Sequence, residues 1–298
     1  MTGKQGAPEI TPELHVFGCG RAARVIVRWL YQAGYIQVGQ IANRRLDSAR
    51  AAVEFIGAGR AVESLDATIA GGWLLLGLPD GELDGQARRL ADALSERPAL
   101  VFHLSGSAPS SILRPISNCI ASVHPVRSFA DPATALPAMP GTWCCAEGQP
   151  RALAALEPAF TAAGGRWLLI SSDHKRLYHA ATVTASNALV ALTAMARELG
   201  VSAGLEAGQA AELIGDLQAS TLDNLRGRPA AAALTGPIER GDVAGVGALV
   251  EAIDAECPDL SPAFRALAAR TLELAIEKRG RREGDSALRE LLTTSRAD

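Results

Sequence analysis

The chain has 298 residues and a formal net charge of −3, so it carries no basic field that would favour nucleic acid as a partner. Hydrophobic residues make up 48% of the chain but aromatic residues only 4%, which favours helix-rich packing of small side chains over an all-β fold. The five cysteines have no spacing typical of a zinc site, and their odd number argues against a disulfide framework. We therefore expect neither a metal centre nor stabilising disulfides, and a reducing compartment.

Neither a targeting signal nor a membrane span is expected from the sequence. Residues 1–12 lack the apolar core of a signal peptide. The apolar runs at 72–79 and 187–196 are too short to cross a bilayer. We expect a cytoplasmic protein that binds no membrane.

A short apolar run, a glycine turn and a helical pattern follow one another at 13–34. The turn has the form G-x-G-x-x-A, the fingerprint of dinucleotide-binding folds. Its glycines allow a tight turn and let backbone amides approach a pyrophosphate, and the helix N-terminus adds partial positive charge. Chance produces such a pattern in ordinary turns, but here the strand and the helix lie where the motif needs them. The predicted coenzyme contacts in this turn are Gly18, Cys19, Gly20, Arg21 and Ala22.

The next apolar run, 38–42, ends in Asn43, Arg44 and Arg45. A site that prefers NAD usually has an acidic residue here, which binds the ribose 2′-hydroxyl, whereas arginine suits a 2′-phosphate. We therefore predict NADP(H) as the cofactor, with these three residues as contacts. The alternative is that both arginines are solvated residues at the start of a helix for which Asp47 is the N-cap.

Further apolar runs alternate with helical patterns up to Ile170, which indicates a doubly wound α/β sheet with right-handed crossovers. Ligands of such sheets bind beyond the carboxyl ends of the strands. Leu78 and Pro79, Ser105 and Gly106, and His124 stand at such ends, so we expect them on the same rim as the glycine turn. Runs at 143–146 and 167–170 should extend the sheet.

After Ile170 the pattern is helical throughout, starting with a long helix at 173–199. We predict an NADP-binding Rossmann domain at 13–171 and an all-helical domain for substrate binding and dimerisation at 172–285.

The long helix carries a polar stripe. Lys175, His179, Thr182 and Ser186 fall within about 40° of one another on a helical wheel, and Asn187 flanks them. A catalytic stripe, a solvent-facing stripe and hydroxyls that bond back to the helix are all compatible with this spacing.

Four segments resemble a bacterial family that joins a Rossmann-like domain to a helical C-terminal domain: HLSG (103–106), HPVRSF (124–129), KRLYHAATVTASN (175–187) and ALTGPIERGD (233–242). This family is similar to 6-phosphogluconate dehydrogenase, 3-hydroxyisobutyrate dehydrogenase, ketopantoate reductase and pyrroline-5-carboxylate reductase. The resemblance covers about 13–280 and implies a helical domain like that of 6-phosphogluconate dehydrogenase. It also implies a homodimer formed through that domain.

In the hydroxyacid dehydrogenases, the helix after the nucleotide domain carries a catalytic lysine, followed four residues later by an asparagine. Lys175 matches the lysine, whereas His179 takes the place of the asparagine, so the substrate does not carry over with the site. The resemblance implies Lys175 and His179 as catalytic residues of an NADP-dependent oxidoreductase that delivers hydride to a C=O or C=N of a small oxo- or imino-acid. The expected substrate contacts are Ser105, Gly106, His124, Ser186 and Asn187.

Two alternatives remain open on the sequence. His124 precedes a proline and is equally compatible with an extended residue bonded to the backbone, and His103 is expected to be structural. A catalytically silent NADP(H) sensor would need the glycine turn and Arg44, but no proton donor.

Overall fold

The computed structural model describes residues 11–293, and the chain divides into two units. The first unit ends at Ser186 and the second begins at Asn187, inside the long helix α6 (Lys175–Ser202). The sequence places its domain boundary at 171–172, between the last strand and this helix. None of the helices between residues 11 and 293 combines the length and apolar character needed to cross a bilayer.

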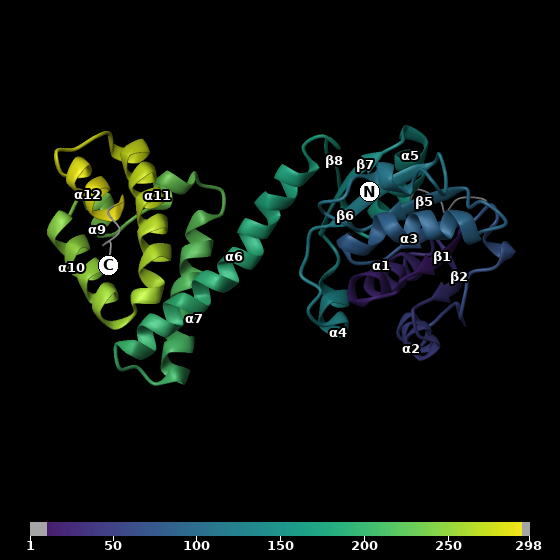
Figure 1. Ribbon diagram of the computed structural model, residues 1–298, viewed down its shortest axis with the longest axis horizontal. Helices are drawn as coiled ribbons and strands as arrows, with labels where there is room; N and C mark the ends of the chain where they lie inside the picture. Colours follow the sequence, from purple (N-terminus) through teal and green to yellow (C-terminus); the bar gives the residue numbers. More distant parts are fainter. Residues whose placement is uncertain (1–10, 294–298) are drawn as a thin grey trace, which may run out of the picture. The chain divides into compact units, whose positions relative to one another are not determined.

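An eight-stranded sheet forms the centre of the first unit, in the order β3-β2-β1-β4-β5-β6-β7-β8 (Figure 1). Neighbouring strands are parallel, except that β6 and β7 are antiparallel. A mostly parallel, doubly wound sheet is therefore confirmed. The strands are β1 (Glu13–Phe17), β2 (Gln37–Ala42), β3 (Arg60–Val62), β4 (Trp73–Leu76), β5 (Leu100–His103), β6 (Ile120–Pro125), β7 (Trp143–Gly148) and β8 (Arg166–Leu169).

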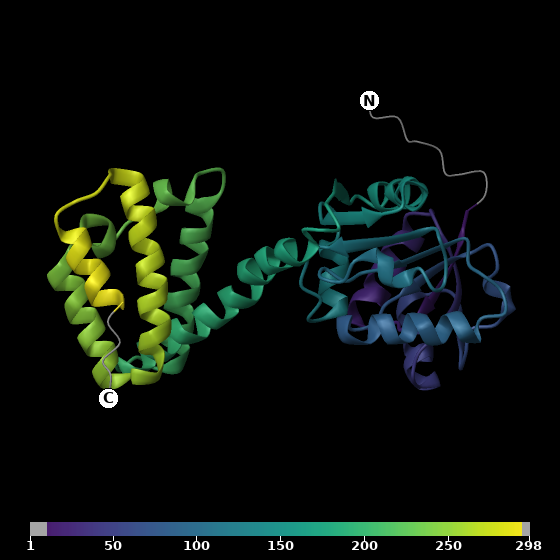
Figure 2. The same cartoon turned by 45° about the horizontal axis from the view of Figure 1, so that its top comes forward.

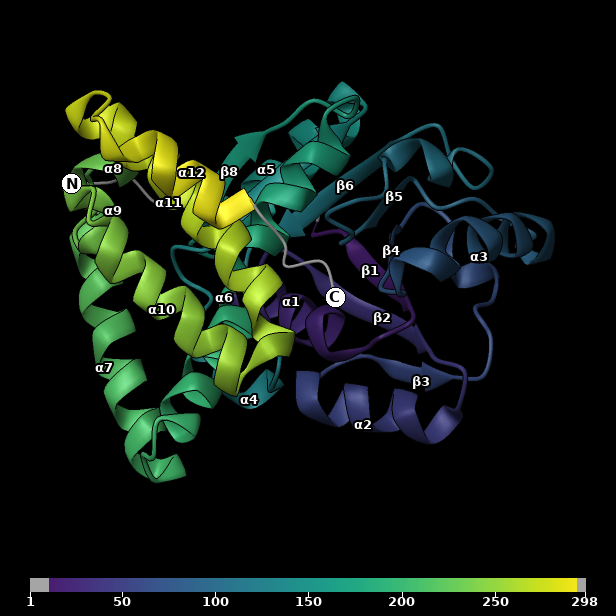
Figure 3. The same cartoon turned by 60° about the vertical axis from the view of Figure 1, so that its left-hand side comes forward.

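Helices cover both faces of this sheet, because alternate strand residues point to opposite sides. On β4, Leu75 packs in one core with residues of α1, α2 and α5, whereas Leu74 and Leu76 pack in another core with α3. Figure 3 shows α2 beside β3, at the edge of the sheet. The helices are α1 (Arg21–Gln32), α2 (Leu46–Ile56), α3 (Asp80–Ala93), α4 (Pro132–Ala135) and α5 (Pro150–Ala162), and a short 3-10 turn, η2, spans Ser110–Leu113.

The antiparallel pairing of β6 with β7 places four polar or ionisable side chains on one face of the sheet: Ser122, His124, Cys145 and Glu147. Ser122 lies opposite Glu147 and His124 lies opposite Cys145 in the register. The intervening residues of both strands pack into the apolar core on the other face. The direction of β7 was not predicted, and it brings Glu147 next to the middle of β6.

The second unit is helical. Its core includes Val246, Val250, Leu272, Leu288 and Leu292, which join α10, α11 and α12; these helices lie side by side in Figure 2. A buried ion pair, with 2.7 Å between Arg279 Nη2 and Asp285 Oδ1, links α11 to α12. Besides the second half of α6, the helices are α7 (Ala207–Leu225), α8 (Ala230–Ala233), α9 (Pro237–Arg240), α10 (Val243–Glu256), α11 (Ser261–Arg279) and α12 (Gly284–Thr293).

Candidate coenzyme and active site

The glycine turn joins β1 to α1 and is held by close backbone contacts. Gly18 has φ +83°, a conformation that disfavours other residues, and its N–H donates to the Ala42 carbonyl at 2.8 Å. A Cβ on Gly18 would overlap the Leu78 side chain. A Cβ on Gly77 would overlap the Gly18 carbonyl and Ala23. The ends of β1 and β4 thus approach closely only because both positions are glycine, and Gly77 was not singled out from the sequence.

The amino end of α1 is open to a ligand. Gly20 is the N-cap, no side chain caps the helix, and no acidic residue lies in its first turn. The first N–H groups of a helix have no partner within it, so they are available to an anion. Nothing lies within 4 Å of a Cβ placed on Gly20 except the Gly77 carbonyl, at 4.0 Å. This geometry fits a pyrophosphate group.

The side chains of Asn43 and Cys19, both predicted coenzyme contacts, are engaged within the protein. The Asn43 side-chain oxygen accepts a hydrogen bond from the Cys19 backbone N–H, so the end of β2 holds the turn in place. Cys19 is buried, and burial raises the pKa of its thiol to about 12. The Cys19 thiol therefore stays protonated and acts in packing.

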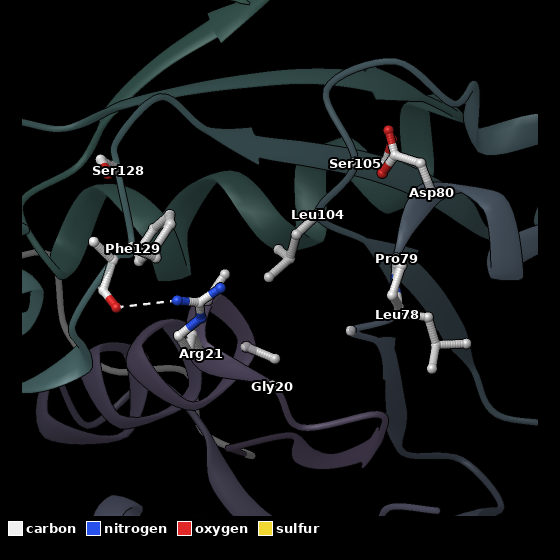
Figure 4. A pocket seen from close by; sticks show the side chains of 13 residues that line it. Gly20, Arg21, Leu78, Pro79, Asp80, Leu104, Ser105, Ser128 and Phe129 are labelled. Atoms are coloured by element: carbon white, nitrogen blue, oxygen red, sulfur yellow. Dashed lines mark hydrogen bonds between the residues drawn. The ribbon is translucent and has the colours of Figure 1, made fainter. Parts of the chain in front are cut away.

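A cavity of about 630 Å³ opens beyond the carboxyl ends of β1, β4 and β5 (Figure 4). This volume lies in the range of small-molecule and cofactor sites, about 300–1,000 Å³. Arg21 Nη1 donates to the Ala130 carbonyl at 3.2 Å, and Asp80 accepts a hydrogen bond from Ser107. Residues lining the cavity include five predicted coenzyme contacts and one predicted substrate contact: Gly20, Arg21, Ala22, Leu78, Pro79 and Ser105.

Arg44 and Arg45 are both exposed and do not line this cavity. The Arg44 side chain is 84% exposed, and its Nη2 lies 3.3 Å from Glu82 Oε2 at the start of α3. Arg45 is itself the N-cap residue of α2. The alternative in which Asp47 caps α2 is therefore wrong: Asp47 lies in the first turn, where it pairs with Arg50.

Lys175, the first residue of α6, is fully buried on the face of β6 and β7. Its Nζ lies 3.2 Å from Glu147 Oε1 and donates to the Ser122 hydroxyl. Glu147 also accepts hydrogen bonds of 2.7 Å from the N–H and the hydroxyl of Ser110 in η2. Burial lowers the pKa of Lys175, and the Glu147 carboxylate acts in the opposite direction. Lys175 is thus enclosed in a polar network and does not line the cavity.

One turn along α6, Tyr178 and His179 face His124. The Tyr178 hydroxyl lies 2.7 Å from His124 Nδ1, and the His124 and His179 rings are 5.8 Å apart. Burial, together with the nearby His179 and Lys175, lowers the pKa of His124 to about 4, and burial raises the pKa of Tyr178. At neutral pH His124 is therefore uncharged. The Tyr178 hydroxyl and His124 Nδ1 share a hydrogen bond whose direction sets which ring nitrogen of His124 carries the proton.

Gly106 makes room for both histidines. A Cβ at this position would overlap Nδ1 of His179 and come within 3.0 Å of His124 Cε1. Gly106 follows Ser105, which lines the cavity, so the two imidazoles lie beside the loop that forms one wall of the cavity. Thr182 donates to the His179 carbonyl at 2.8 Å, bonding back to its own helix. The structure thus brings together Gly106, His124 and His179.

The remaining predicted residues have other surroundings. The Ser105 hydroxyl accepts from the N–H groups of Ser107 and Ala108, which stabilises the loop. His103 is fully buried, its Nδ1 accepts from the Ser105 N–H, and its pKa falls to about 3, mainly through burial; His103 is structural, as expected. Ser186 and Asn187 are exposed on α6 and lie outside the group formed by Gly106, His124 and His179.

Tyr178, Glu147 and Ser122 were missed as site residues, yet the sequence holds a signal for two of them. Polar or ionisable residues alternate with apolar ones in both β6 and β7, at Ser122 and His124 and at Cys145 and Glu147. Such a period of two on a strand marks a shared face. Recognising that the two faces meet required the antiparallel pairing. Residues 11–293 contain no group of three or more His, Cys, Asp or Glu placed to hold a metal ion.

Comparison with known proteins agrees with this architecture. Residues 142–271 match the family model described as "Domain of unknown function (DUF2520)". No curated protein matches the chain. The solved structure of protein TM1727 from Thermotoga maritima is 25% identical with a TM-score of 0.70, covering 89% of this chain and 99% of that one.

Two further structures carry functional names. A structure described as "putative NADP oxidoreductase BF3122 from Bacteroides fragilis" is 19% identical with a TM-score of 0.70 and covers 88% of this chain and 98% of its own. A pyrroline-5-carboxylate reductase from Coxiella burnetii is 17% identical with a TM-score of 0.57, covering 96% and 100%. The predicted resemblance is confirmed: this chain has a Rossmann-like sheet followed by a helical part, the fold of these reductases.

Proposed function

We propose that this chain is an NADP-dependent reductase that adds hydride to a C=N or C=O carbon of a small oxo- or imino-acid. One observation carries the proposal: His179 and His124 lie against Gly106, beside the loop that forms one wall of the cavity at the strand ends. A bound nicotinamide would supply the hydride, and a proton donor is then needed for the nitrogen or oxygen of the substrate. A protein that only binds the coenzyme would not need two imidazoles at this position.

The chain offers a separate element for each part of the coenzyme. The open end of α1 and Gly20 suit the pyrophosphate, and the cavity between Leu78 and Ser105 suits the nicotinamide half. Arg44, at the end of β2, suits a 2′-phosphate, which would displace its contact with Glu82. A reductive aminase from Aspergillus terreus with the same fold, solved in complex with NADPH, supports this choice of coenzyme.

We assign proton donation to His179, which is half-buried and meets Gly106 directly. Thr182 and His124 restrict the orientation of its ring. We assign Lys175, the other predicted catalytic residue, a positioning role. Its ion pair with Glu147 fixes the start of α6 on the sheet, about one turn before Tyr178 and His179.

The charge at the cavity favours an imine. Asp80 lines one side of the cavity next to Ser105, and Arg21, on the other side, lies at the start of α1 where the coenzyme phosphates are expected (Figure 4). Arg127 does not line the cavity, and its Nε donates to the Thr142 hydroxyl at 2.8 Å, so we do not count it in the charge at the cavity. When His179 gives its proton to the imine nitrogen, the protonated C=N group that forms would be stabilised by the Asp80 carboxylate, whereas a carbonyl would gain less. A pyrroline-5-carboxylate reductase shares this fold, in agreement with such a substrate.

Replacing Arg44 by Gln tests the coenzyme assignment. We expect the Kd for NADPH to rise about 10- to 100-fold, because a charge-assisted guanidinium–phosphate contact is lost, while the Kd for NADH changes less than about twofold. Fluorescence titration of both coenzymes measures this. Arg50→Gln, at an exposed arginine of α2, is the matched control and should leave both values unchanged. Equal weakening of NADPH and NADH binding, or no binding of either, would contradict the assignment.

A screen of cyclic imines and keto acids for NADPH oxidation tests turnover itself. We expect the imines to be reduced faster than the keto acids of matching size. NADPH binding without oxidation of any member would favour the silent sensor instead.

We also propose a homodimer formed through the helical unit. An apolar groove of about 290 Å³ lies there between α6 and α11, lined by residues such as Leu192, Leu199 and Leu267. On α7, Leu213 and Leu217 are 52% and 60% exposed. Apolar side chains exposed in this number along neighbouring helices are typical of a protein–protein interface.

Leu217→Glu should therefore convert the protein from a dimer to a 31.0 kDa monomer, because a carboxylate would be buried at the interface. Light scattering coupled to size-exclusion chromatography measures the mass. Ala51→Glu, which adds the same charge at an exposed position of α2, should remain dimeric. A wild-type protein that already runs as a monomer would refute this proposal.

A further inference from the structure

A second cavity lies at the amino ends of the strands, opposite the carboxyl ends where the coenzyme cavity opens. It has a volume of about 470 Å³ and adjoins the amino ends of β5 and β6, which begin at Leu100 and Ile120. We call it the arginine cavity, after the three arginines that line it. Its lining residues are Arg97, Ala99, Arg114, Pro115, Ile116, Ser117, Asn118, Cys119 and Arg151.

The charge in the arginine cavity is of one sign. Arg97, Arg114 and Arg151 line it, and no carboxylate does. Within residues 11–293, none of these three guanidinium groups lies in an ion pair. Arg97 donates to the carbonyl oxygens of Pro115 and Ile116, at 3.2 and 3.5 Å, which orients it and the loop without neutralising it. The cavity therefore has unbalanced positive charge in a chain whose net charge is negative.

The amino end of α5 adds to this charge. Arg151 is the second residue of that helix, and no acidic residue lies in its first turn. A cation is unfavourable at this end, where the helix dipole is positive, and acidic side chains are the residues usually found there. Three unpaired guanidinium groups beside a helix N-terminus repel one another, and a bound anion would remove that repulsion.

We propose that the arginine cavity binds a small organic phosphate or diphosphate, separate from the coenzyme. Guanidinium groups match the geometry of phosphate oxygens and bind them bidentately. Asn118, which also lines the cavity, carries an uncharged amide group that can donate hydrogen bonds. A volume of 470 Å³ lies within the range for small-molecule sites and leaves room for an organic group beside the phosphate. A concave site on an acidic protein favours a small anion over a nucleic-acid strand, which is bound along an extended basic surface.

The test is calorimetric titration with inorganic pyrophosphate at constant ionic strength, using sodium chloride as the reference salt. We expect saturable binding of one pyrophosphate per chain in the presence of saturating NADPH, which occupies the phosphate sites of the coenzyme. The double variant Arg114→Gln/Arg151→Gln should weaken this binding at least about tenfold, because two charge-assisted contacts are lost. Both residues are exposed, so the variant should fold, and its melting temperature without pyrophosphate verifies this.

Arg50→Gln, at an exposed arginine that lines neither cavity, is the matched control and should bind pyrophosphate as the wild type does. If NADPH abolishes pyrophosphate binding, or if Arg44→Gln weakens it while the double variant does not, the anion site is the coenzyme site and the inference fails. A heat of titration with pyrophosphate that equals the heat of titration with sodium chloride also overturns the inference. A single-stranded oligonucleotide that binds more tightly than pyrophosphate and needs Arg114 and Arg151 would replace it with a nucleic-acid surface. None of these outcomes depends on reductase activity, so the proposed function can fail independently.

Discussion

Glu147→Gln is expected to destabilise the first unit by about 3–5 kcal/mol at pH 7, the range found when one partner of a buried ion pair is removed. Glu147 and Lys175 are 5% and 0% exposed, so the ammonium group would remain buried without its counter-charge. The glutamine oxygen can still accept one hydrogen bond from Ser110, but the amide nitrogen cannot replace the second. Chemical denaturation followed by circular dichroism measures the loss.

The pH dependence of that loss identifies its cause. Burial lowers the pKa of Lys175 below the value of 10.5 that the unfolded chain has, and removing the carboxylate lowers it further. Between the folded and unfolded pKa values the unfolded chain binds more protons, so stability due to Lys175 rises with pH in that window. The deficit of Glu147→Gln relative to the wild type should therefore shrink as the pH is raised from 7 towards 10.

Two further variants make this result decisive. Glu157→Gln removes an exposed carboxylate from α5 and should change stability by less than about 0.5 kcal/mol. Glu147→Gln/Lys175→Met removes both charges and should be more stable than Glu147→Gln alone, because no unpaired charge remains buried. A deficit that stays constant between pH 7 and 10, or a double variant no more stable than the single one, would show that Glu147 acts through packing and not through Lys175.

The local elements were predictable because their signals are local. The glycine turn, the apolar runs and the helical periodicity each lie within a stretch no longer than the 28 residues of α6, and the strands and long helices that they indicate are present. The rim of strand ends followed from the general geometry of parallel sheets. The structure brings His124 and Gly106 together at this rim, as that geometry predicts. No signal in the sequence indicated that His124 is hydrogen-bonded to Tyr178, the residue before His179.

The extent to which each side chain is buried was less predictable. Lys175, His179 and Ser186 share a stripe on the helical wheel, yet Lys175 is fully buried, His179 is half-buried and Ser186 is exposed. Only the start of α6 packs against β6 and β7, so the same face of the helix passes from core to solvent within three turns. The partner that buries Lys175 is Glu147, 28 residues earlier, on a strand whose direction cannot be read from the sequence pattern.

His179→Phe is expected to lower kcat for imine reduction by about 10²- to 10⁴-fold, the usual contribution of a general acid. The Kd for NADPH should stay within about twofold of the wild-type value, since His179 lies outside the residues assigned to the coenzyme. Phenylalanine keeps a planar ring against Gly106 and removes only the transferable proton. Steady-state kinetics with NADPH and fluorescence titration of the coenzyme measure the two quantities. His174→Phe, at an exposed histidine just before α6, is the matched control and should retain wild-type turnover.

Gly106→Ala tests the same geometry from the opposite side. The backbone of Gly106 is outside the left-handed region, so alanine is tolerated there, but its Cβ would displace the His179 ring. We expect turnover to fall and NADPH binding to persist, as for His179→Phe, and the double variant to be little worse than either single one. If His179→Phe retains full turnover, His179 is not the donor. The Tyr178–His124 pair then becomes the source of the proton, and a loss of turnover in Tyr178→Phe would establish it.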